Sequence, residues 1–438
     1  MENYNIALLG CGTVGSGTAK IISEFSAALS ERSGKKINIS KIVDLRPMAA
    51  AKKAGVDISL FVNPKEELSK EEASAAIKEV LADKSIDLVV ETIGGDGDYI
   101  KNIHESVLKA GKNLVTANKS LLAKTGKSLF ETAKENNKSI GFEAAVCGAI
   151  PIIKGLTECF TGDDILSVYG IMNGTSNFIL SNMSSRGISF EEALKEAQRL
   201  GYAEADPSLD INGGDAANKL KILIQMIYGV DARSITIGVN GIDVIKPVDV
   251  AFAKQINSVI KLICYAKREG NKLYAAVRPM MLHKDIFLAD INGATNAVRL
   301  INKYSGENIL VGQGAGMEET GSAIVSDIVK IARGDKQRSS IAWQECEIKP
   351  FEEHAMNFNI ILKSKDMPGV TGAAAKAIGD ENVNIFTIGP NFHEGEFAYF
   401  SIVTETATLN QINRAVAKMR ELKPGAFEKD VKVFPIIK

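Results

Sequence analysis

An excess of charge of either sign is missing from this 438-residue sequence: 52 lysines and arginines face 53 aspartates and glutamates, a net charge of −1. A protein without a strong overall field does not attract polyanions, so we expect neither nucleic acid nor an acidic membrane surface as a partner. Long apolar runs are missing as well, since no stretch reaches the roughly 18 apolar residues of a membrane span. The first residues, MENYNIALLG, lack the basic segment of a secretion signal. We therefore expect an unprocessed, cytoplasmic protein.

Paired cysteines are also missing. The five cysteines are scattered and odd in number, and they form neither a C-x-x-C pair nor a cluster with histidine. Such usage fits a reducing cytoplasm and argues against a structural zinc site. The cysteines are Cys11, Cys147, Cys159, Cys264 and Cys346.

Apolar residues, by contrast, make up 45% of the chain, enough for the cores of two to four domains. The first part of the chain alternates short apolar runs with helical stretches, which predicts an α/β fold of the Rossmann type with a doubly wound parallel sheet. The expected strands cover residues 5–9, 39–45, 87–92, 113–118 and 139–146, and the expected helices cover 14–30, 71–83, 99–110 and 121–136.

After Pro151 this rhythm changes, and a second domain of the α+β type is the simplest interpretation. Helices are expected at 151–160, 190–200 and 215–228, and strands at 165–172, 273–281 and 286–291. A strand, Gly-rich turn and helix over 308–332 then fit a return of the chain to the first domain. The last part has the order βαββαβ, typical of a ferredoxin-like domain. The predicted first domain covers 1–148 and the second covers 149–307. Residues 308–338 return to the first domain, 339–355 form a linker, and 356–438 form the last domain.

The first motif that indicates chemistry is Gly10-Cys11-Gly12-Thr13-Val14-Gly15. In a G-x-G-x-x-G turn the glycines allow a tight bend, close approach of a pyrophosphate to backbone N–H groups, and packing of helix on strand. The motif alone is weak evidence. Its position between the first expected strand and helix favours a dinucleotide site over an ordinary Gly-rich turn, and 1–148 is expected to be the dinucleotide-binding domain.

An acidic residue that accepts the ribose hydroxyls is expected at the end of the second strand, where Asp44 stands. It follows Gly15 at a greater distance than usual, so an additional helix or loop must lie between them. Arg46, two residues later, is suited to a 2′-phosphate instead. The sequence favours NAD and leaves NADP open, and the alternative is that both side chains only decorate a strand end.

Two polar segments follow later strands, Glu91-Thr92-Ile93-Gly94-Gly95 and Thr116-Ala117-Asn118-Lys119. The carboxyl ends of parallel strands face the ligand crevice of a doubly wound sheet. Lys119 is therefore a candidate to approach the nicotinamide and the substrate, although a lysine at a strand end is often only solvated.

Residues 201–219 gather four carboxylates and a lysine before an apolar helix. Asp215 and Lys219 are four residues apart and share one face of that helix, whose dipole stabilises Asp215 near its start. An ordinary surface ion pair is the alternative. Three turn residues give the acids a compact shape, which favours a polar binding pocket; they are Pro207, Gly213 and Gly214.

This segment resembles the signature of homoserine dehydrogenases at each defined position. The resemblance covers about residues 1–335 and is specific because several separate stretches match. The matching positions are Ala197, Gly201, Asp206-Pro207, Asp210, Gly213, Asp215 and Lys219, together with Thr116–Lys119, Glu143-Ala144, Val146, Gly148, Ile150-Pro151, Asn173–Phe178 and Gly314-Ala315-Gly316.

The resemblance implies reversible NAD(P)H-dependent reduction of L-aspartate 4-semialdehyde to L-homoserine, on the route to threonine, isoleucine and methionine. It makes Lys219 the proton donor or acceptor, with Lys119 beside the nicotinamide, and either ammonium would stabilise a developing alkoxide. Asp215 would orient the Lys219 amine or bind substrate. The other implied contacts are Glu204, Asp210, Gly174 and Thr175 to the substrate, and Gly10, Gly12, Thr13, Val14, Gly15, Asp44, Arg46, Thr92, Lys119 and Gly316 to the dinucleotide.

The resemblance also implies a monovalent cation, commonly sodium, near a hinge between domains. Its ligands would be Glu143 and the backbone carbonyls of Val146, Gly148 and Ile150, which are hard oxygen donors. Cys147 lies within this stretch, where a thiol would suit a nucleophilic aldehyde dehydrogenase. No histidine is positioned by a motif to activate it, so we expect a buried and inert cysteine.

The tail resembles an ACT domain through Asp366-Met367-Pro368-Gly369-Val370 and through Asn382–Ile385. Such domains pair and bind an amino acid at their interface, so the implied role is feedback inhibition by threonine. A tail that only dimerises is the alternative. The resemblance further implies a homodimer, or a homotetramer if the tails pair. It also implies the monofunctional form of the enzyme, which has no aspartate kinase domain.

Two other functions stay open. One is another amino-acid oxidoreductase of the same two-domain design, which would need a different pocket between Glu204 and Lys219. The other is a catalytically silent amino-acid sensor that uses the tail. The intact lysines and carboxylates favour an active enzyme.

Overall fold

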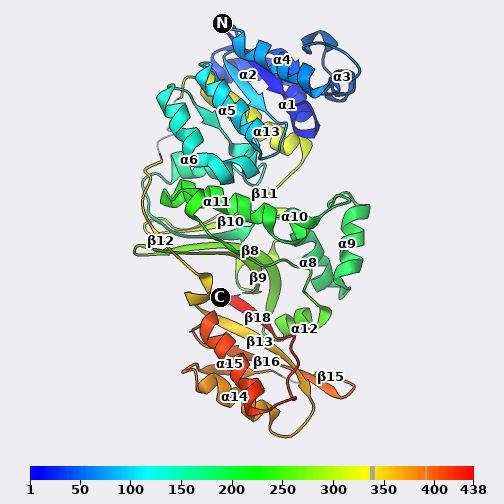
Figure 1. Cartoon of the computed structure of the whole chain (residues 1–438), viewed down its shortest axis with the longest axis vertical. Coiled ribbons are helices and arrows are strands. Elements are labelled where there is room, and N and C mark those ends of the chain that lie inside the picture. The colour runs from blue at the N-terminus through cyan, green and yellow to red at the C-terminus, as the bar shows by residue number, and fades with distance from the viewer. Residues whose placement is uncertain (336–340, 390–391) are drawn as a thin grey trace. The chain divides into compact units, whose positions relative to one another are not determined.

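The structure is a computed structural model, which describes residues 1–335, 341–389 and 392–438 (Figure 1). The chain folds into two compact units. Unit 1 contains Met1–Ile165, Asn218–Ile235 and Asn302–Glu345, and unit 2 contains Leu166–Ala217, Thr236–Ile301 and Cys346–Lys438. The predicted boundaries divide the chain more finely, and those at 338 and 339 lie outside the described residues. Among the described residues, no helix is long and apolar enough to cross a membrane.

Unit 1 is built on a parallel sheet with the strand order β2-β1-β3-β4-β5, which confirms the predicted Rossmann-like architecture. Neighbouring residues of a strand point to opposite faces, and Val89 and Val90 are both fully buried, so both faces are covered. Phe61 makes an isolated parallel bridge with Ile42 beyond the β2 edge. The strands are β1 (Asn3–Leu9), β2 (Lys36–Val43), β3 (Leu88–Glu91), β4 (Asn113–Thr116) and β5 (Ile140–Gly141).

Two helices distant in sequence lie side by side in unit 1, α1 (Thr13–Glu24) and α13 (Met317–Ala332) (Figure 1). A Cβ atom on Gly17 would lie 2.2 Å from the carbonyl oxygen of Met317, and one on Gly321 would lie 2.8 Å from the carbonyl carbon of Gly17. Glycine at both positions therefore allows the two backbones to meet. This contact brings the late segment of the chain onto the dinucleotide-type sheet.

Two expected elements of unit 1 differ from the prediction. The expected helix 14–30 is interrupted at Phe25, whose φ of −110° and ψ of 14° leave the helical region, and α2 (Ser26–Ser33) follows. The expected strand 139–146 ends at Gly141 and becomes a 3-10 helix over Glu143–Ala145. The Glu143 N–H donates to the carboxylate of Asp327 (2.9 Å) and so does not extend the sheet.

Unit 2 contains a mixed sheet with the order β10-β6-β8-β9-β18-β13-β16-β14. Its longest pairing joins β8 (Ser258–Glu269) to β9 (Lys272–His283) in an antiparallel hairpin. The sequence predicted β9 and missed β8, because β8 is buried on both faces through most of its length and has little period-2 alternation. The predicted strand at 286–291 is wrong. Phe287–Asp290 is a 3-10 helix that buries Leu288 and Ala289, since a short apolar run is compatible with either structure.

The C-terminal part of unit 2 has the predicted βαββαβ order, with the strands arranged β18-β13-β16-β14. The helices α14 (Val370–Gly379) and α15 (Leu409–Leu422) pack against one face of these strands (Figure 1). β18 (Lys432–Ile437) also pairs in parallel with β9, through Ile436 opposite Met281. The sheet of the tail is therefore continuous with the rest of unit 2, and part of the predicted linker forms β12 (Glu347–Lys349), which pairs with β9 too.

The remaining elements are α3 (Pro47–Ala54), α4 (Lys70–Ala82), α5 (Asp98–Lys109), α6 (Lys119–Glu135), α7 (Ile152–Lys154), α8 (Gly174–Arg186), α9 (Phe190–Arg199), α10 (Ser208–Ile211), α11 (Gly214–Tyr228), α12 (Pro247–Gln255), β6 (Ile165–Ile171), β7 (Gly238–Val239), β10 (Thr295–Asn302), β11 (Gly306–Gln313), β13 (Ala355–Lys365), β14 (Ile385–Ile388), β15 (Phe392–Glu394), β16 (Phe397–Thr404) and β17 (Ala407–Thr408).

Candidate active site

The turn between β1 and α1 forms a cradle for a phosphate. Gly10 has a φ of 88°, and a Cβ on Gly15 would lie 2.2 Å from the carbonyl oxygen of Gly10, so both positions require glycine. A Cβ on Gly12 would meet nothing within 4 Å, which leaves open space above the turn. Gly12 is also the N-cap of α1 and provides no side-chain cap. The first N–H groups of α1 thus point to a space that suits a pyrophosphate.

The other predicted dinucleotide contacts belong to unit 1: Thr13, Val14 and Thr92 lie at or next to this turn, and Gly316 lies at the start of α13. Thr13 opens α1 and its hydroxyl accepts a hydrogen bond from the Lys53 ammonium (3.0 Å). The Thr92 hydroxyl donates to the carbonyl of Gly10 (2.7 Å) and so ties the end of β3 to the turn. Val14 is partly buried within α1, and Gly316 is the N-cap of α13. A φ of 145° at Gly316 explains the need for glycine there.

Asp44 is tied to the backbone on two sides. One carboxylate oxygen accepts the Cys11 N–H (2.6 Å) and the other accepts the Arg46 N–H (2.8 Å). Asp44 and Arg46 line a cavity of about 990 Å³ together with Gly10, Gly12 and Thr92. Two further lysines on α4 line the same cavity, a feature that no motif in the sequence announced; they are Lys70 and Lys78. The cavity therefore offers the fixed carboxylate of Asp44, the carboxylate of Glu71 and three cationic groups to the adenosine half of a dinucleotide.

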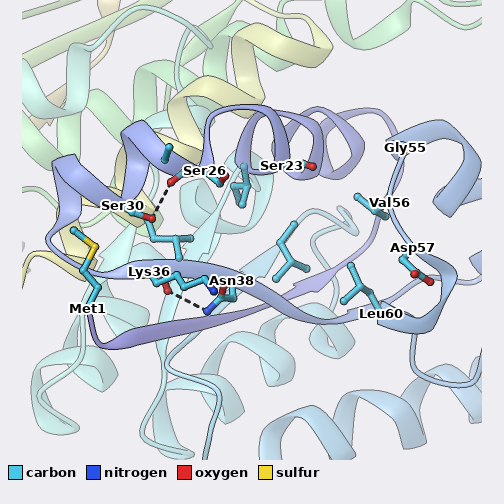
Figure 2. A pocket seen from close by; sticks show the side chains of 14 residues that line it. Met1, Ser23, Ser26, Ser30, Lys36, Asn38, Gly55, Val56, Asp57 and Leu60 are labelled. Carbon is cyan, nitrogen blue, oxygen red and sulfur yellow. Dashed lines mark hydrogen bonds between the residues drawn. The ribbon is translucent and has the colours of Figure 1, made fainter.

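A second cavity, of about 640 Å³, lies on the same unit between α1, α2 and the outer part of β2 (Figure 2). Its labelled side chains are mostly serine, apolar or amide groups, and Ser30 donates to the carbonyl of Ser26 (2.8 Å). Lys36 and Asp57 are the charged residues in its lining. This set holds no catalytic combination of groups, so the larger cavity beside the Gly turn is the candidate site.

A buried hydrogen-bond network supports the strand ends that face the crevice. His104 Nε2 lies 2.7 Å from a carboxylate oxygen of Glu91, and both side chains are completely buried. The same oxygen accepts the Thr116 hydroxyl (2.9 Å), and the other accepts the N–H groups of Ile93 (2.7 Å) and Gly94 (3.0 Å). Burial alone would raise the pKa of Glu91. The hydrogen bonds to its carboxylate, that from His104 first among them, outweigh burial and hold the pKa below its usual value.

The network continues from Thr116 to the helix that carries Lys119. The Thr116 hydroxyl accepts the Asn118 N–H (3.0 Å), and the Asn118 amide donates to the carbonyl of Gly95 (2.6 Å). Asn118 then caps α6, whose first residue is Lys119. The sequence had presented Glu91 only as part of a polar strand end and His104 as a histidine without a motif. Their pairing depends on how α5 packs on β3, which no local pattern announces.

The two predicted catalytic lysines belong to unit 1 and stand on helices that pack together. Lys219 lies on α11 and is 7% exposed. The residues next to the two lysines are in contact, since the Asn218 amide donates to the Ser120 hydroxyl (3.5 Å). The structure thus brings the two helices that carry Lys119 and Lys219 into contact beside these residues.

The predicted carboxylates meet on Asn173 in unit 2. The Asn173 amide nitrogen donates to Asp210 (2.6 Å) and to Asp215 (3.0 Å), while its oxygen caps α8 at the Ser176 N–H (2.8 Å). Asp215 lies in the first turn of α11, one turn before Lys219. Because two carboxylates repel each other, a shared amide donor holds them together in a fixed arrangement.

The other predicted substrate residues frame this cluster. A Cβ on Gly174 would lie 2.6 Å from the carbonyl oxygen of Ala294, so the start of α8 packs directly on that loop. The Thr175 hydroxyl donates to the carbonyl of Tyr202 (2.6 Å), and Glu204 is exposed two residues later. The acids, the amide and the small residues make a site that suits a substrate ammonium group.

The predicted cation ligands lie in a strained turn of unit 1. The backbone of Cys147 and Gly148 has positive φ, 55° and 47°, and Cys147 is fully buried. The Glu143 carboxylate already accepts the N–H groups of Ile153 and Lys154, both at 2.8 Å. Burial, followed by the neighbouring Asp327, raises the pKa of Glu143 to about 7. Within the part of the chain that the structure describes, no group of three or more His, Cys, Asp or Glu side chains is arranged to hold a metal.

The chain matches two family models. The model described as "Homoserine dehydrogenase, NAD binding domain" matches residues 10–143, and the model described as "Homoserine dehydrogenase" matches residues 151–329. The chain is 36% identical over 436 residues to a homoserine dehydrogenase of Neisseria gonorrhoeae, with 96% of each covered.

Solved structures agree. The crystal structure of a homoserine dehydrogenase from Thiobacillus denitrificans has a TM-score of 0.90 at 32% identity and covers 100% of this chain and 99% of its own. A hyperthermophilic archaeal homoserine dehydrogenase mutant in complex with NADPH has a TM-score of 0.63 at 28% identity, with 77% of this chain and 99% of that chain covered.

Proposed function

The chain belongs to the homoserine dehydrogenase family and is an NAD(P)-dependent oxidoreductase, and from this premise we propose the reaction, the residue roles and the regulation described below. The reaction is the reversible reduction of L-aspartate 4-semialdehyde to L-homoserine. Two observations support the proposal. In unit 1, Asn218 and Ser120 join the helices that carry Lys119 and Lys219. In unit 2, Asn173 holds the carboxylate of Asp215.

Reduction of an aldehyde requires a hydride for its carbon and a proton for its oxygen, and we assign the roles of the residues accordingly. When bound, the reduced nicotinamide supplies the hydride that adds to the aldehyde carbon. Lys219 donates a proton to the aldehyde oxygen, and in the reverse direction it removes the proton of the homoserine hydroxyl. Lys119 stabilises the developing alkoxide by its charge. Asp215 orients the Lys219 amine, because it stands one turn earlier on the same helix.

Substrate recognition falls to the carboxylates and to the start of α8. Asp210 and Glu204 bind the α-ammonium group, and Gly174 and Thr175 close the pocket around the rest of the molecule. The support for this proposal is the hydrogen bond from Asn173 that holds Asp210 in place. Homoserine-dependent reduction of NAD and of NADP by the purified protein tests the reaction, and no turnover with either cofactor in a folded sample would contradict it.

The dinucleotide contacts we propose are Gly10, Gly12, Thr13, Val14, Gly15 and Thr92 at the phosphates, with Gly316 nearby and Asp44 and Arg46 at the ribose. Asp44 favours a free 2′-hydroxyl, whereas Arg46 with Lys70 and Lys78 favours a 2′-phosphate. The ratio of turnover with NAD to turnover with NADP decides which set dominates.

A monovalent cation is proposed at the 143–150 turn. Its proposed ligands are Glu143 and the backbone carbonyl oxygens of Val146, Gly148 and Ile150, which are hard oxygen donors. The Glu143 carboxylate also accepts two backbone N–H groups, which fix its position in the turn. Titration of dialysed enzyme with sodium and with potassium, at constant ionic strength, tests this site through activity.

Feedback inhibition by threonine is proposed through the ACT-like tail, and a homodimer or homotetramer as the assembly. A cavity of about 200 Å³ supports an amino-acid effector, since its lining carries charges of both signs from α12 and from the strands of the tail. Burial raises the pKa of Asp249 in this cavity to about 6, so the ammonium group of a bound amino acid would stabilise its ionised form. Homoserine oxidation is expected to fall with threonine in the wild type and to resist it in Asp249→Asn. Equal inhibition of both proteins would exclude this cavity.

A further inference from the structure

One buried charged side chain of unit 2 has no role in the mechanism above. Lys261 lies on β8 and is 2% exposed. Four oxygen atoms lie within hydrogen-bond distance of its ammonium group, which has three N–H donors to share among them. They are the carbonyl of Ile291 (2.6 Å), the side-chain amides of Asn177 and Asn292 (3.1 Å each) and the Ser181 hydroxyl (3.4 Å). All four acceptors are uncharged. Burial lowers the pKa of Lys261 to about 8, which still leaves it mostly protonated at neutral pH.

The acceptors belong to two segments that both touch the substrate site. Asn177 and Ser181 are on α8, which begins at Gly174 and lies beside β8 (Figure 1). Ile291 and Asn292 open the loop that continues to Ala294, whose carbonyl oxygen packs on Gly174. Lys261 therefore joins the first turns of α8 to the loop that confines them.

Asn177 strengthens the same junction from the other side. Its amide nitrogen donates to the carbonyls of Ile291 (3.0 Å) and Thr295 (3.2 Å), while its oxygen accepts from Lys261. At the start of the same helix, Asn173 holds Asp210 and Asp215. A shift of the α8 start would move that amide and both carboxylates together.

We propose that Lys261 is a positioning residue for the substrate site, which fixes the start of α8 against the 291–295 loop and thereby sets the geometry of Asn173, Asp210 and Asp215. The catalytic consequence of this inference rests on the proposed function. The structural part, that Lys261 holds the start of α8 against the 291–295 loop, does not depend on it. The burial of an ammonium group among neutral oxygens has a high desolvation cost. Only the hydrogen bonds to α8 and to the 291–295 loop offset that cost, so the buried ammonium group ties the two segments to one arrangement.

The chain offers a matched control. Lys112 is also 2% exposed, and its ammonium group likewise donates to backbone carbonyls, those of Asp83 and Ile86. It lies in unit 1, just before β4 and at the end of the sheet opposite the Gly turn. Replacement of either lysine by methionine leaves buried acceptors without a donor, so both variants should lose stability to a similar extent.

The experiment compares Lys261→Met with Lys112→Met in the full-length enzyme. For Lys261→Met we expect kcat/KM for homoserine to fall by about 10-fold to 100-fold with a raised KM, while the dissociation constant for NADPH stays within about 2-fold, because a small displacement of positioning groups acts on substrate geometry. Lys112→Met should leave KM for homoserine unchanged. Lys261→Arg, which keeps the charge, should recover part of the loss.

Hydrogen exchange tests, without any enzyme assay, whether Lys261 holds the start of α8 in place. Backbone amides of residues 173–177 should exchange faster in Lys261→Met than in Lys112→Met. If Lys261→Met does not fold, Asn292→Ala, at an exposed residue, decides the matter through the same two readouts. Unchanged KM and unchanged exchange at 173–177 would overturn the inference. Absence of wild-type turnover together with faster exchange would instead contradict only the proposed reaction.

Discussion

Removal of His104 is expected to damage both stability and dinucleotide binding. The His104 ring and the Glu91 carboxylate are completely buried and 2.7 Å apart. Loss of one partner from such a pair typically costs about 3–5 kcal/mol, because the remaining charge has no water to stabilise it. Glu91 keeps the hydrogen bonds from Thr116, Ile93 and Gly94, so we place His104→Leu near the lower end, at about 3 kcal/mol.

The functional consequence follows from what Glu91 supports. Its carboxylate holds the backbone after Thr92, which borders the cavity beside the Gly turn, and through Thr116 it supports the start of α6. His104→Leu should therefore weaken NADPH binding and lower turnover in addition to its effect on stability. Glu91→Gln keeps the shape and one of the two acceptor oxygens and leaves no unpaired charge, so it should cost less, about 1–2 kcal/mol.

Urea unfolding gives the free energies, and fluorescence titration with NADPH gives the affinity. His283→Leu provides the control, since His283 is a partly exposed histidine on β9 and in the other unit. The reasoning would be refuted by a His104→Leu protein whose unfolding free energy lies within about 0.5 kcal/mol of wild type and whose NADPH affinity is unchanged, because that is the range of ordinary surface substitutions.

Three further predictions test other parts of the molecule. Lys219→Ala should lower turnover by about 10²-fold to 10⁴-fold and leave NADPH affinity intact, and a parallel loss of affinity would mean that the lysine is structural. Asp44→Ala should weaken NAD more than NADP in a binding titration, and equal effects would remove Asp44 from ribose recognition. Burial, followed by Lys267, lowers the pKa of His354 to about 4, whereas the unfolded chain binds that proton near pH 6.5. The neutral, buried His354 therefore stabilises the fold above pH 6.5, and this stabilisation, up to about 3 kcal/mol, is lost as the pH falls towards 4. Between pH 7 and pH 4.5, the free energy of unfolding measured with urea should fall less for His354→Phe than for the wild type.

Local patterns predicted the parts of the fold in which one segment specifies its own structure. The Gly10–Gly15 turn, the parallel strands of unit 1 and the βαββαβ order of the tail all follow from short-range periodicity and turn residues. β8 was missed because burial on both faces removes the alternation by which strands are identified. The strand predicted at 286–291 was wrong because a short apolar run is compatible with a strand or a helix.

In the candidate site, too, the sequence predicted the residues but not the contacts between distant segments. Motifs and the family resemblance named Lys119, Lys219, Asp210 and Asp215, and the structure adds how they are held. Asn173 joins the two aspartates, and Asn218 with Ser120 joins the two lysine-bearing helices. Neither contact has a signal in sequence spacing, because each links residues that are far apart along the chain.

By itself, the sequence determined the class of the protein, the dinucleotide turn and the residue types of the chemistry, since these depend on local backbone requirements and on side-chain identity. Only the tertiary structure decided the buried partners: His104 for Glu91, the four oxygens around Lys261, and the pairing of β18 with β9. The physical reason is that the stability of a buried polar group depends on which distant segments surround it, and that is settled by packing.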